Sequence, residues 1–113
     1  MMGVSPEQAA ESTAAAGADI VGANCGNGIS NMAQISKRIR AALPKIPIII
    51  QANAGMPKIE DGKTVFPETP EYMASQVKEL IEAGANIIGG CCGTTPDHIA
   101  AIAKASRAFL THC

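Results

Sequence analysis

The chain has 113 residues, 47% of them hydrophobic and only 3% aromatic, and its nine basic residues nearly balance its ten acidic ones. This length suits one small domain with an aliphatic core, and the balanced charge argues against a nucleic-acid partner, which requires a clustered basic face. No apolar stretch approaches the roughly 20 residues of a membrane helix and no secretory signal is evident, so we expect a cytoplasmic protein without a membrane partner.

The first predicted helix begins after Ser5, a favourable N-cap residue. Pro6 suits the first helical position, and Glu7 places a carboxylate in the first turn, where the helix dipole favours it. Gly17 is expected to end this helix. The apolar residues 18–23 then predict a buried strand, which leads into a loop of turn-forming residues, Asn24-Cys25-Gly26-Asn27-Gly28.

A second helix is predicted at about residues 31–43, with Ser30 or Asn31 as its N-cap. Its inward positions follow helical spacing and are Met32, Ile35, Ile39 and Leu43. Its basic residues are expected in solvent and are Lys37, Arg38 and Arg40. Residues 46–51 include three consecutive isoleucines and predict a strand buried on both faces, as in a parallel sheet.

Residues 55–69 contain prolines, glycines and several charges and predict a long loop, which in a compact domain is usually a lid or a binding loop. A third helix is predicted from Thr69 to Gly84, with four inward residues, Met73, Val77, Leu80 and Ile81. Thr95-Pro96-Asp97 opens the last helix, whose apolar side is expected to carry Ile99, Ile102, Ala103 and Ala105.

One stretch of the chain occurs twice. Residues 16–26 (Ala-Gly-Ala-Asp-Ile-Val-Gly-Ala-Asn-Cys-Gly) correspond to residues 83–93 (Ala-Gly-Ala-Asn-Ile-Ile-Gly-Gly-Cys-Cys-Gly). In each copy an Ala-Gly pair closes a helix, an apolar run predicts a strand, and cysteine follows where that strand ends. Reactive groups at the carboxyl ends of parallel strands are typical of α/β active sites.

The predicted order of elements is α-β-α-β-α-β-α. This alternation implies an α/β fold with three parallel strands and right-handed crossover helices. All three strands lead into polar loops, which favours part of a (β/α)8 TIM barrel over a small doubly wound sheet. Because three strands cannot close an eight-stranded barrel, we expect residues 1–113 to be the C-terminal portion of one.

Three cysteines lie at the predicted ends of two strands that flank the isoleucine-rich strand: Cys25, Cys91 and Cys92. The flanking backbones should be roughly 10 Å apart, and inward side chains could close most of that gap. Three protein ligands and one open position are typical of catalytic zinc. Buried cysteines without a metal are the alternative, and a disulfide is less favoured in the cytoplasm. Cys113 is expected to be a free thiol.

Three segments of the chain resemble the homocysteine S-methyltransferase family. They are Gly22-Ala23-Asn24-Cys25-Gly26, Gln51-Ala52-Asn53-Ala54-Gly55-Met56-Pro57, and Gly89-Gly90-Cys91-Cys92-Gly93-Thr94-Thr95-Pro96-Asp97-His98-Ile99. The resemblance covers essentially the whole chain and is closest to the homocysteine-binding barrel of cobalamin-dependent members.

This resemblance implies a zinc-dependent (β/α)8 barrel whose metal is held by Cys25, Cys91 and Cys92. It also implies the chemistry, in which the homocysteine sulfur takes the open zinc position and, as a thiolate, attacks the methyl group of a donor to give methionine. The donor would be cobalamin or another methyl carrier on other domains. A nearby cation stabilises a deprotonated thiol at neutral pH, which is consistent with this chemistry.

Family barrels also have an N-terminal half with acidic residues that help to hold the homocysteine amino group, and no segment of this chain corresponds to it. The resemblance therefore assigns the chain to helix 5 through helix 8 of the barrel. We expect the isolated chain to have little or no activity. Its expected partners are homocysteine, a methyl-donor domain or the missing N-terminal half-barrel, and a homo-oligomer formed through open sheet edges.

Two asparagines are candidate substrate-binding residues. Asn24 precedes a proposed ligand and could bond the substrate or a ligand sulfur, or could simply form a turn. Asn53 ends the central strand, where a strand cap is the alternative. His98 lies in the first turn of the last helix, so we expect a capping or surface role rather than metal ligation. Thr94 and Thr95 are expected to cap that helix and support the metal, with phosphate binding as the alternative.

Two other functions remain open from the sequence. One is a non-catalytic zinc-binding or self-associating half-barrel fragment. The other is a phosphate-binding half-barrel whose cysteines are structural.

Overall fold

The computed structural model describes residues 4–25 and 28–111, so the predictions for Cys113 and for loop residues 26–27 lie outside it. The helices are α1 (Pro6–Ala15), α2 (Ile29–Ala42), α3 (Pro70–Ser75), α4 (Val77–Glu82) and α5 (Pro96–Thr111). The strands are β1 (Val21–Cys25), β2 (Ile48–Ala52), β3 (Lys58–Glu60), β4 (Lys63–Val65) and β5 (Ile87–Gly90). In the described ranges no helix is both long and apolar enough to span a bilayer.

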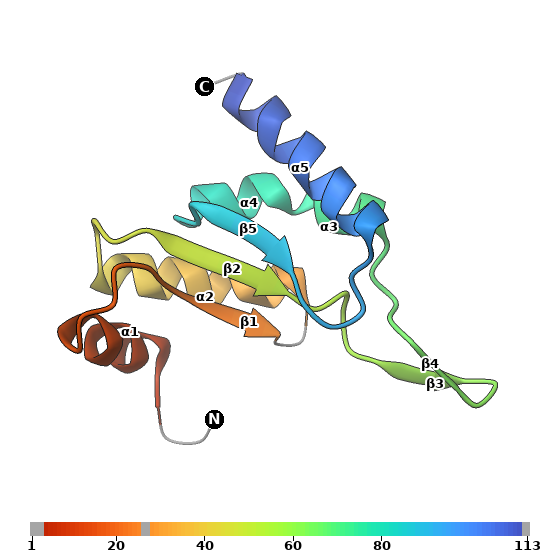
Figure 1. Ribbon diagram of the computed structural model, residues 1–113, viewed down its shortest axis with the longest axis horizontal. Helices are drawn as coiled ribbons and strands as arrows, with labels where there is room; N and C mark the ends of the chain where they lie inside the picture. Colours follow the sequence, from red (N-terminus) through yellow and green to blue (C-terminus); the bar gives the residue numbers. More distant parts are fainter. Residues whose placement is uncertain (1–3, 26–27, 112–113) are drawn as a thin grey trace.

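Three of the strands form a parallel sheet in the order β1-β2-β5, with helices along the chain between them (Figure 1). The register pairs Ala23 with Ile50 and Ile50 with Ile88. This arrangement confirms the predicted α/β fold with three parallel strands, and it is consistent with part of a TIM barrel. Parallel strands end at the same edge of a sheet, so the carboxyl ends of β1, β2 and β5 lie together there.

Strand β2 is buried on one face only. Ile48, Ile50 and Ala52 are fully buried, whereas Ile49 is half-buried and Gln51 is exposed on the opposite face. The prediction of a strand buried on both faces is therefore wrong. Helices such as α2, which runs behind the strands in Figure 1, cover one face of the sheet, and the side chains follow the two-residue period of a half-covered strand.

The first helix begins as predicted, but the boundaries of two other elements differ. Gln8 N–H donates to Ser5 Oγ and Ser5 N–H donates to Gln8 Oε1, both at 3.1 Å, which is a capping box. The strand predicted at 18–23 is observed at Val21–Cys25. The helix predicted at 31–43 begins earlier, at Ile29, and its N-cap is Gly28 rather than Ser30 or Asn31.

The helix predicted between Thr69 and Gly84 is divided at Gln76 into α3 and α4, and its inward residues are buried or half-buried as expected. On α5, Ile102 is buried, but Ile99 is 45% exposed, contrary to the prediction. Ile99 lies beside the open edge of β5, where no described element covers it. Helical spacing predicted the apolar stripe, but it could not predict how much of that stripe the fold covers.

Residues 55–69 do not form the predicted loop throughout. They contain an antiparallel hairpin of β3 and β4, which projects from the sheet in Figure 1. Its turn is Asp61-Gly62, with φ of 50° and 76°. Asp-Gly favours the two-residue type I′ turn, which needs positive φ at both positions. This dipeptide was the available sequence signal for the hairpin.

Arg40 was expected in solvent but is half-buried. Its guanidinium donates to the backbone oxygens of Leu43 (3.0 Å), Ile46 (2.9 Å) and Gly84 (2.7 Å) and to Asn86 Oδ1 (2.7 Å). These acceptors lie at the end of α2 and in the turns that lead into β2 and β5. The planar fork of arginine suits several acceptors at once, which explains why this cation leaves the solvent-exposed face of its helix.

Candidate metal centre

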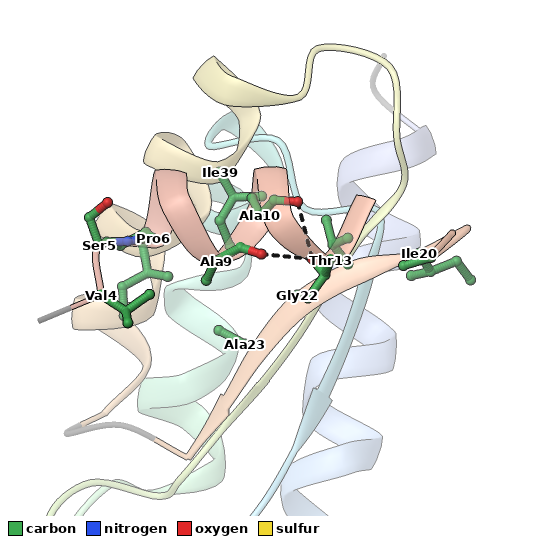
Figure 2. A pocket seen from close by; sticks show the side chains of 13 residues that line it. Val4, Ser5, Pro6, Ala9, Ala10, Thr13, Ile20, Gly22, Ala23 and Ile39 are labelled. Atoms are coloured by element: carbon green, nitrogen blue, oxygen red, sulfur yellow. Dashed lines mark hydrogen bonds between the residues drawn. The ribbon is translucent and has the colours of Figure 1, made fainter. Parts of the chain in front are cut away.

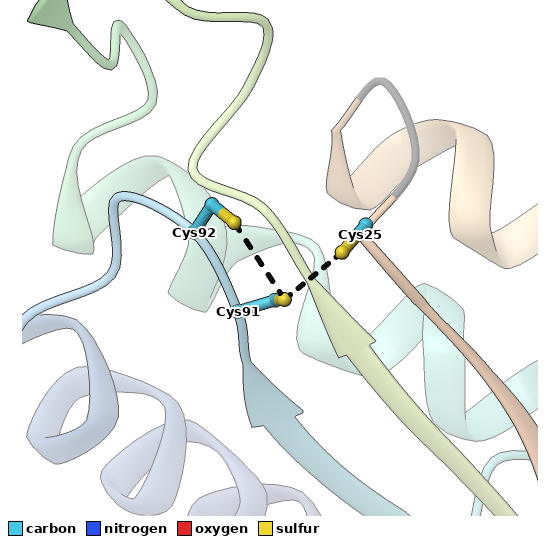
Figure 3. A group of neighbouring side chains, drawn as sticks. All are labelled: Cys25, Cys91 and Cys92. Atoms are coloured by element: carbon cyan, nitrogen blue, oxygen red, sulfur yellow. Dashed lines mark hydrogen bonds between the residues drawn. The ribbon is translucent and has the colours of Figure 1, made fainter.

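Three cysteine sulfurs meet at the carboxyl edge of the parallel sheet. Cys25 is the last residue of β1, and Cys91 and Cys92 directly follow β5. The Sγ atoms of Cys25 and Cys91 are 3.0 Å apart and those of Cys91 and Cys92 are 4.0 Å apart; all three lie within 4.8 Å of one another. Figure 3 shows the Cys91 sulfur between the other two.

The end of the central strand holds the backbones of all three cysteines. The N–H of Cys91 donates to Ala52 O (2.9 Å), and the N–H of Asn53 donates to Cys25 O (3.1 Å). The N–H of Cys92 donates to Asn53 Oδ1 (3.0 Å), and the N–H of Ala54 donates to Cys92 O (3.0 Å). We call residues 52–54 the central hub. It links the end of β1 with the segment after β5. Their cysteines Cys25 and Cys91 are 66 residues apart in sequence.

The loop after β5 depends on Gly93. This residue has a φ of 81°, which L-residues other than glycine rarely adopt, and a Cβ there would collide with the ring of Phe66. Thr94 Oγ then donates to Cys91 O at 2.7 Å, which closes the turn behind the cysteine pair. The turn therefore directs consecutive cysteines toward the same site, although neighbouring residues of a strand point to opposite faces.

Hydrogen bonding between the sulfurs shifts the pKa values of Cys25 and Cys91 in opposite directions. The Cys25 thiol lies within hydrogen-bonding distance of the Cys91 sulfur, and this contact raises the pKa of Cys25 to about 11 while it lowers the pKa of Cys91. Asn24 Nδ2 lies 3.3 Å from Cys25 Sγ and 4.0 Å from Cys91 Sγ, and its N–H group donates to them. Cys91 is therefore the sulfur of this pair that ionises first.

The donor set and the spacing fit a zinc ion. Zinc binds thiolate sulfur at about 2.3 Å, so sulfurs that share one ion lie roughly 4 Å apart, within the range observed here. Cys25 and Cys91 are half-buried and Cys92 is exposed, so the cluster is accessible to a further ligand. Three thiolates can stabilise a soft divalent cation through direct coordination.

Other residues singled out in the sequence have structural partners at this edge. His98 is only 7% exposed; its Nδ1 accepts a hydrogen bond from Thr95 N–H at 3.1 Å. The capping role predicted for His98 is therefore confirmed, and the surface alternative is wrong. Asn53 is 9% exposed and orients Cys92 through its side-chain oxygen.

Glu68 was not identified from the sequence. Its Oε1 accepts the N–H of Ile29 at 3.3 Å, so it caps α2, whose own N-cap residue, Gly28, has no side chain. A glycine at the N-cap indicates that another group must satisfy the first N–H groups of the helix, but no local pattern could show that Glu68 supplies it.

In the described part of the chain, two apolar grooves lie at the open sides of the sheet, and no cysteine is among their described lining residues. The α1–β1 groove has a volume of about 540 Å³, and Figure 2 shows Val4, Ala9 and Ile20 among its lining residues. The β5–α5 groove has a volume of about 370 Å³ and is lined in part by Ile87 and Ile99. Apolar grooves thus lie at the two sides of the sheet, whereas the cysteine cluster lies at its carboxyl edge.

Comparison with known proteins gives a consistent assignment. A sequence profile described as homocysteine S-methyltransferase matches residues 1–106. The chain is 36% identical to the methionine synthase of Mycobacterium leprae and 34% identical to that of Mycobacterium tuberculosis, each over 79% of the chain. It is 32% identical to the mouse (Mus musculus) S-methylmethionine–homocysteine S-methyltransferase BHMT2 over 97% of the chain.

These relatives are much longer than the matched segment. The matches span 7% of the Mycobacterium leprae protein, 8% of the Mycobacterium tuberculosis protein and 36% of the mouse protein. The profile nevertheless covers most of the 113 residues, including all three clustered cysteines. The resemblance inferred from the three sequence segments is thereby confirmed: the chain belongs to the homocysteine S-methyltransferase family.

Proposed function

We propose that residues 1–113 form the zinc-binding portion, helix 5 through helix 8, of a homocysteine-binding (β/α)8 barrel. In this proposal Cys25, Cys91 and Cys92 would hold the ion, which could then also bind the homocysteine sulfur. The observation that supports it is the convergence of three sulfurs within 4.8 Å, from two strands separated by a third. The family to which the chain belongs supplies the substrate class.

A bound zinc ion would lower the pKa of the homocysteine thiol, so that the thiolate is available at neutral pH. The thiolate sulfur then forms a bond to the methyl carbon of the donor, and the bond between that carbon and the donor breaks, with its electron pair leaving on the donor. The thiol proton goes to solvent. With a divalent ion bound, three cysteine thiolates would leave the site net negative, which would keep electron density on the homocysteine sulfur.

Asn24 and Asn53 are proposed to contact homocysteine. Asn24 is exposed beside the sulfurs, so its amide is accessible to a ligand at the cluster. Asn53 lies beneath the cluster, where its oxygen already accepts a hydrogen bond from Cys92 N–H. We propose that Asn53 acts mainly by orienting Cys92, and that any contact it makes with the substrate is at the cysteine cluster.

The complete reaction requires parts that this chain does not contain. We propose that the remaining strands of the barrel and a domain that carries cobalamin or another methyl donor are its partners, in the cytoplasm. The two apolar grooves support this view, because a neighbouring strand and helix would bury their exposed residues, among them Ile20 and Ile87. By itself the chain is expected to bind metal but to transfer methyl groups weakly or not at all.

Metal analysis of the chain, purified under reducing conditions, tests the proposal. We expect about one zinc per chain, and loss of more than 90% of it in Cys92→Ala, because two thiolates hold zinc much less tightly than three. Cys113→Ser is the matched control, since it removes a cysteine that this proposal does not assign as a ligand, and it should leave the stoichiometry unchanged. Wild-type protein without zinc, or equal loss in the control, would refute the metal site.

A methyl-transfer assay separates the enzymatic role from a non-catalytic one. Homocysteine methylation should appear when the chain is combined with the remaining half of a family barrel and a methyl donor, and it should disappear in Cys92→Ala. Zinc binding without any methylation in the combined protein would favour the non-catalytic fragment.

Phosphate binding at α5 is disfavoured, because Thr95 N–H and His98 N–H already donate within the capping pair.

A further inference from the structure

We propose that His98 and Glu68 are positioning residues that clamp the two cysteine-bearing loops against each other. This inference rests on the function proposed above. Neither residue belongs to the sulfur cluster. Each acts through backbone hydrogen bonds to segments close in sequence to the cysteines. The clamp is the pair of hydrogen bonds through which Glu68 connects the start of α2 with the start of α5.

The orientation of the His98 ring follows from its partners. Nδ1 accepts the N–H of Thr95 at 3.1 Å and lies 2.9 Å from Thr95 Oγ. A backbone N–H can only donate, so Nδ1 carries no proton here. Nε2 carries it instead and donates to the backbone oxygen of Glu68 at 2.8 Å. The ring therefore bridges the N-terminus of α5, just after the Cys91–Cys92 turn, to a distant segment.

Glu68 completes the connection on the other side. Its Oε1 accepts Ile29 N–H at 3.3 Å, at the start of the helix that follows the Cys25 loop, and its own N–H donates to Ala54 O at 2.9 Å. One residue thus contacts the Cys25 side, the central hub and, through His98, the Cys91–Cys92 side. A Cβ on Gly28 would meet the Glu68 carboxylate, so the backbone of Gly28 lies close to this side chain.

This arrangement has a functional consequence. The hub residues 52–54 hold the cysteine backbones, whereas the Glu68–His98 clamp restricts how far the start of α2 and the start of α5 can separate. Groups that orient metal ligands from outside commonly change metal affinity by about 10- to 100-fold when they are removed. Because the clamp contacts backbone rather than sulfur, we expect an effect near the lower end of that range.

Two substitutions of His98 separate its two hydrogen bonds. In His98→Gln the side-chain nitrogen can replace Nε2 and keep the bond to Glu68 O, whereas in His98→Asn the side-chain oxygen can replace Nδ1 and keep only the Thr95 cap. Zinc affinity of the full chain is measured by competition with a chromophoric chelator. We expect His98→Asn to weaken binding about tenfold and His98→Gln to remain within about threefold of wild type.

A second pair tests the other half of the clamp. Glu68→Ala removes the acceptor for Ile29 N–H and should weaken zinc binding by a similar factor, while Glu68→Gln retains an acceptor oxygen and should restore most of it. Gln8→Ala is the matched control, since it removes the same kind of N-terminal capping bond from α1 without touching either cysteine loop. Its zinc affinity should equal that of the wild type.

A metal-free readout makes the outcome independent of the proposed function. Amide hydrogen exchange at Cys92, whose N–H donates to Asn53 Oδ1, should accelerate about tenfold in His98→Asn and stay unchanged in Gln8→Ala. Unchanged exchange and unchanged affinity in His98→Asn, or equal losses in the Asn and Gln variants, would overturn the clamp. Wild-type protein that binds no zinc, with exchange still dependent on His98, would instead overturn only the proposed function.

Discussion

Asn24 Nδ2 lies 3.3 Å from Cys25 Sγ and 4.0 Å from Cys91 Sγ, in an exposed position beside the sulfurs. An amide N–H that faces thiolates stabilises their negative charge through a charge-assisted hydrogen bond. A carboxylate at the same position cannot donate and would add a further negative charge to a cluster of three thiolates. We therefore expect substitution of Asn24 to change the zinc affinity, although Asn24 is not proposed as a ligand.

We expect Asn24→Ala to weaken zinc binding by about tenfold, since one donor to the ligand sulfurs is lost. Asn24→Asp should weaken it further, although its side chain is nearly the same size, because only the donor and the charge have changed. Chelator competition gives the affinities, and the absorption bands of the cobalt-substituted protein report on the sulfur geometry. Aspartate that binds zinc as tightly as asparagine would show that the amide does not interact with the thiolates.

At the level of elements, Arg40 connects helix α2 to the turns that precede β2 and β5. Four oxygen acceptors share its guanidinium, including Gly84 O and Asn86 Oδ1, both at 2.7 Å. Arg40→Met keeps much of the aliphatic stem but leaves these acceptors without their donor. We expect a loss of about 2–3 kcal/mol in the free energy of unfolding, measured by urea denaturation.

Lys37 provides the control for this substitution, because it lies exposed on the same helix. Lys37→Met should change the free energy of unfolding by less than about 0.5 kcal/mol. Arg40→Lys should resemble Arg40→Met, since an ammonium group lacks the planar fork that reaches several acceptors. Equal stability of the wild type and Arg40→Met would show that solvent satisfies these acceptors equally well.

Helices α1 and α2 are linked by an exposed ion pair. Arg38 donates to Glu7 at 2.8 and 2.7 Å, and these bonds hold the pKa of the Glu7 carboxyl below its usual value of 4.5. A carboxyl group whose pKa is lowered by folding stabilises the folded state above the unfolded pKa. That contribution is lost as the pH falls through the lower, folded pKa.

The difference in melting temperature between the wild type and Glu7→Gln should therefore be present at pH 7 and should shrink as the pH falls below 4.5 and through the lower, folded pKa of Glu7. It should also decrease in high salt, because the pair is exposed. Glu11→Gln, on the same helix, is the control. A difference that persisted unchanged at low pH would exclude the ion pair as its cause.

At the level of the whole molecule, the sheet has two open edges with an apolar groove beside each. Ile20 is 48% exposed at the β1 side and Ile87 is 42% exposed at the β5 side. Open edges with adjacent apolar surface favour association with other strands, so the isolated chain should self-associate. Sedimentation velocity at increasing concentration should show species larger than a monomer.

Ile87→Lys should shift this distribution toward the monomer, because a charge at the edge opposes strand pairing. Ile59→Lys is the control: Ile59 is 75% exposed, but it lies on the projecting hairpin rather than at an open edge of the parallel sheet. A wild-type chain that sediments as a monomer at all concentrations would contradict the prediction. Identical sedimentation of the two variants would exclude the open edge as the cause of self-association.

The alternation of helices and strands, the first helix cap and the pairing of cysteines with strand ends were predictable because they depend on local chemistry. Ser5 and Gln8 form the capping box, and the two repeat copies end at the same edge once the strands are parallel. The Asp61-Gly62 hairpin also had a local signal, although the prolines and charges around it favoured a loop. Family membership followed from short segments around the cysteines.

Long-range partners were decided only by the tertiary structure. The sequence by itself determined that three cysteines lie at or directly after the carboxyl ends of two strands. Only the fold decided that their sulfurs lie within 4.8 Å, that residues 52–54 bond all three cysteine backbones, and that Glu68 caps a helix 39 residues away. The physical reason is that local propensity acts over a few neighbours, whereas these contacts exist only after β2 is inserted between β1 and β5.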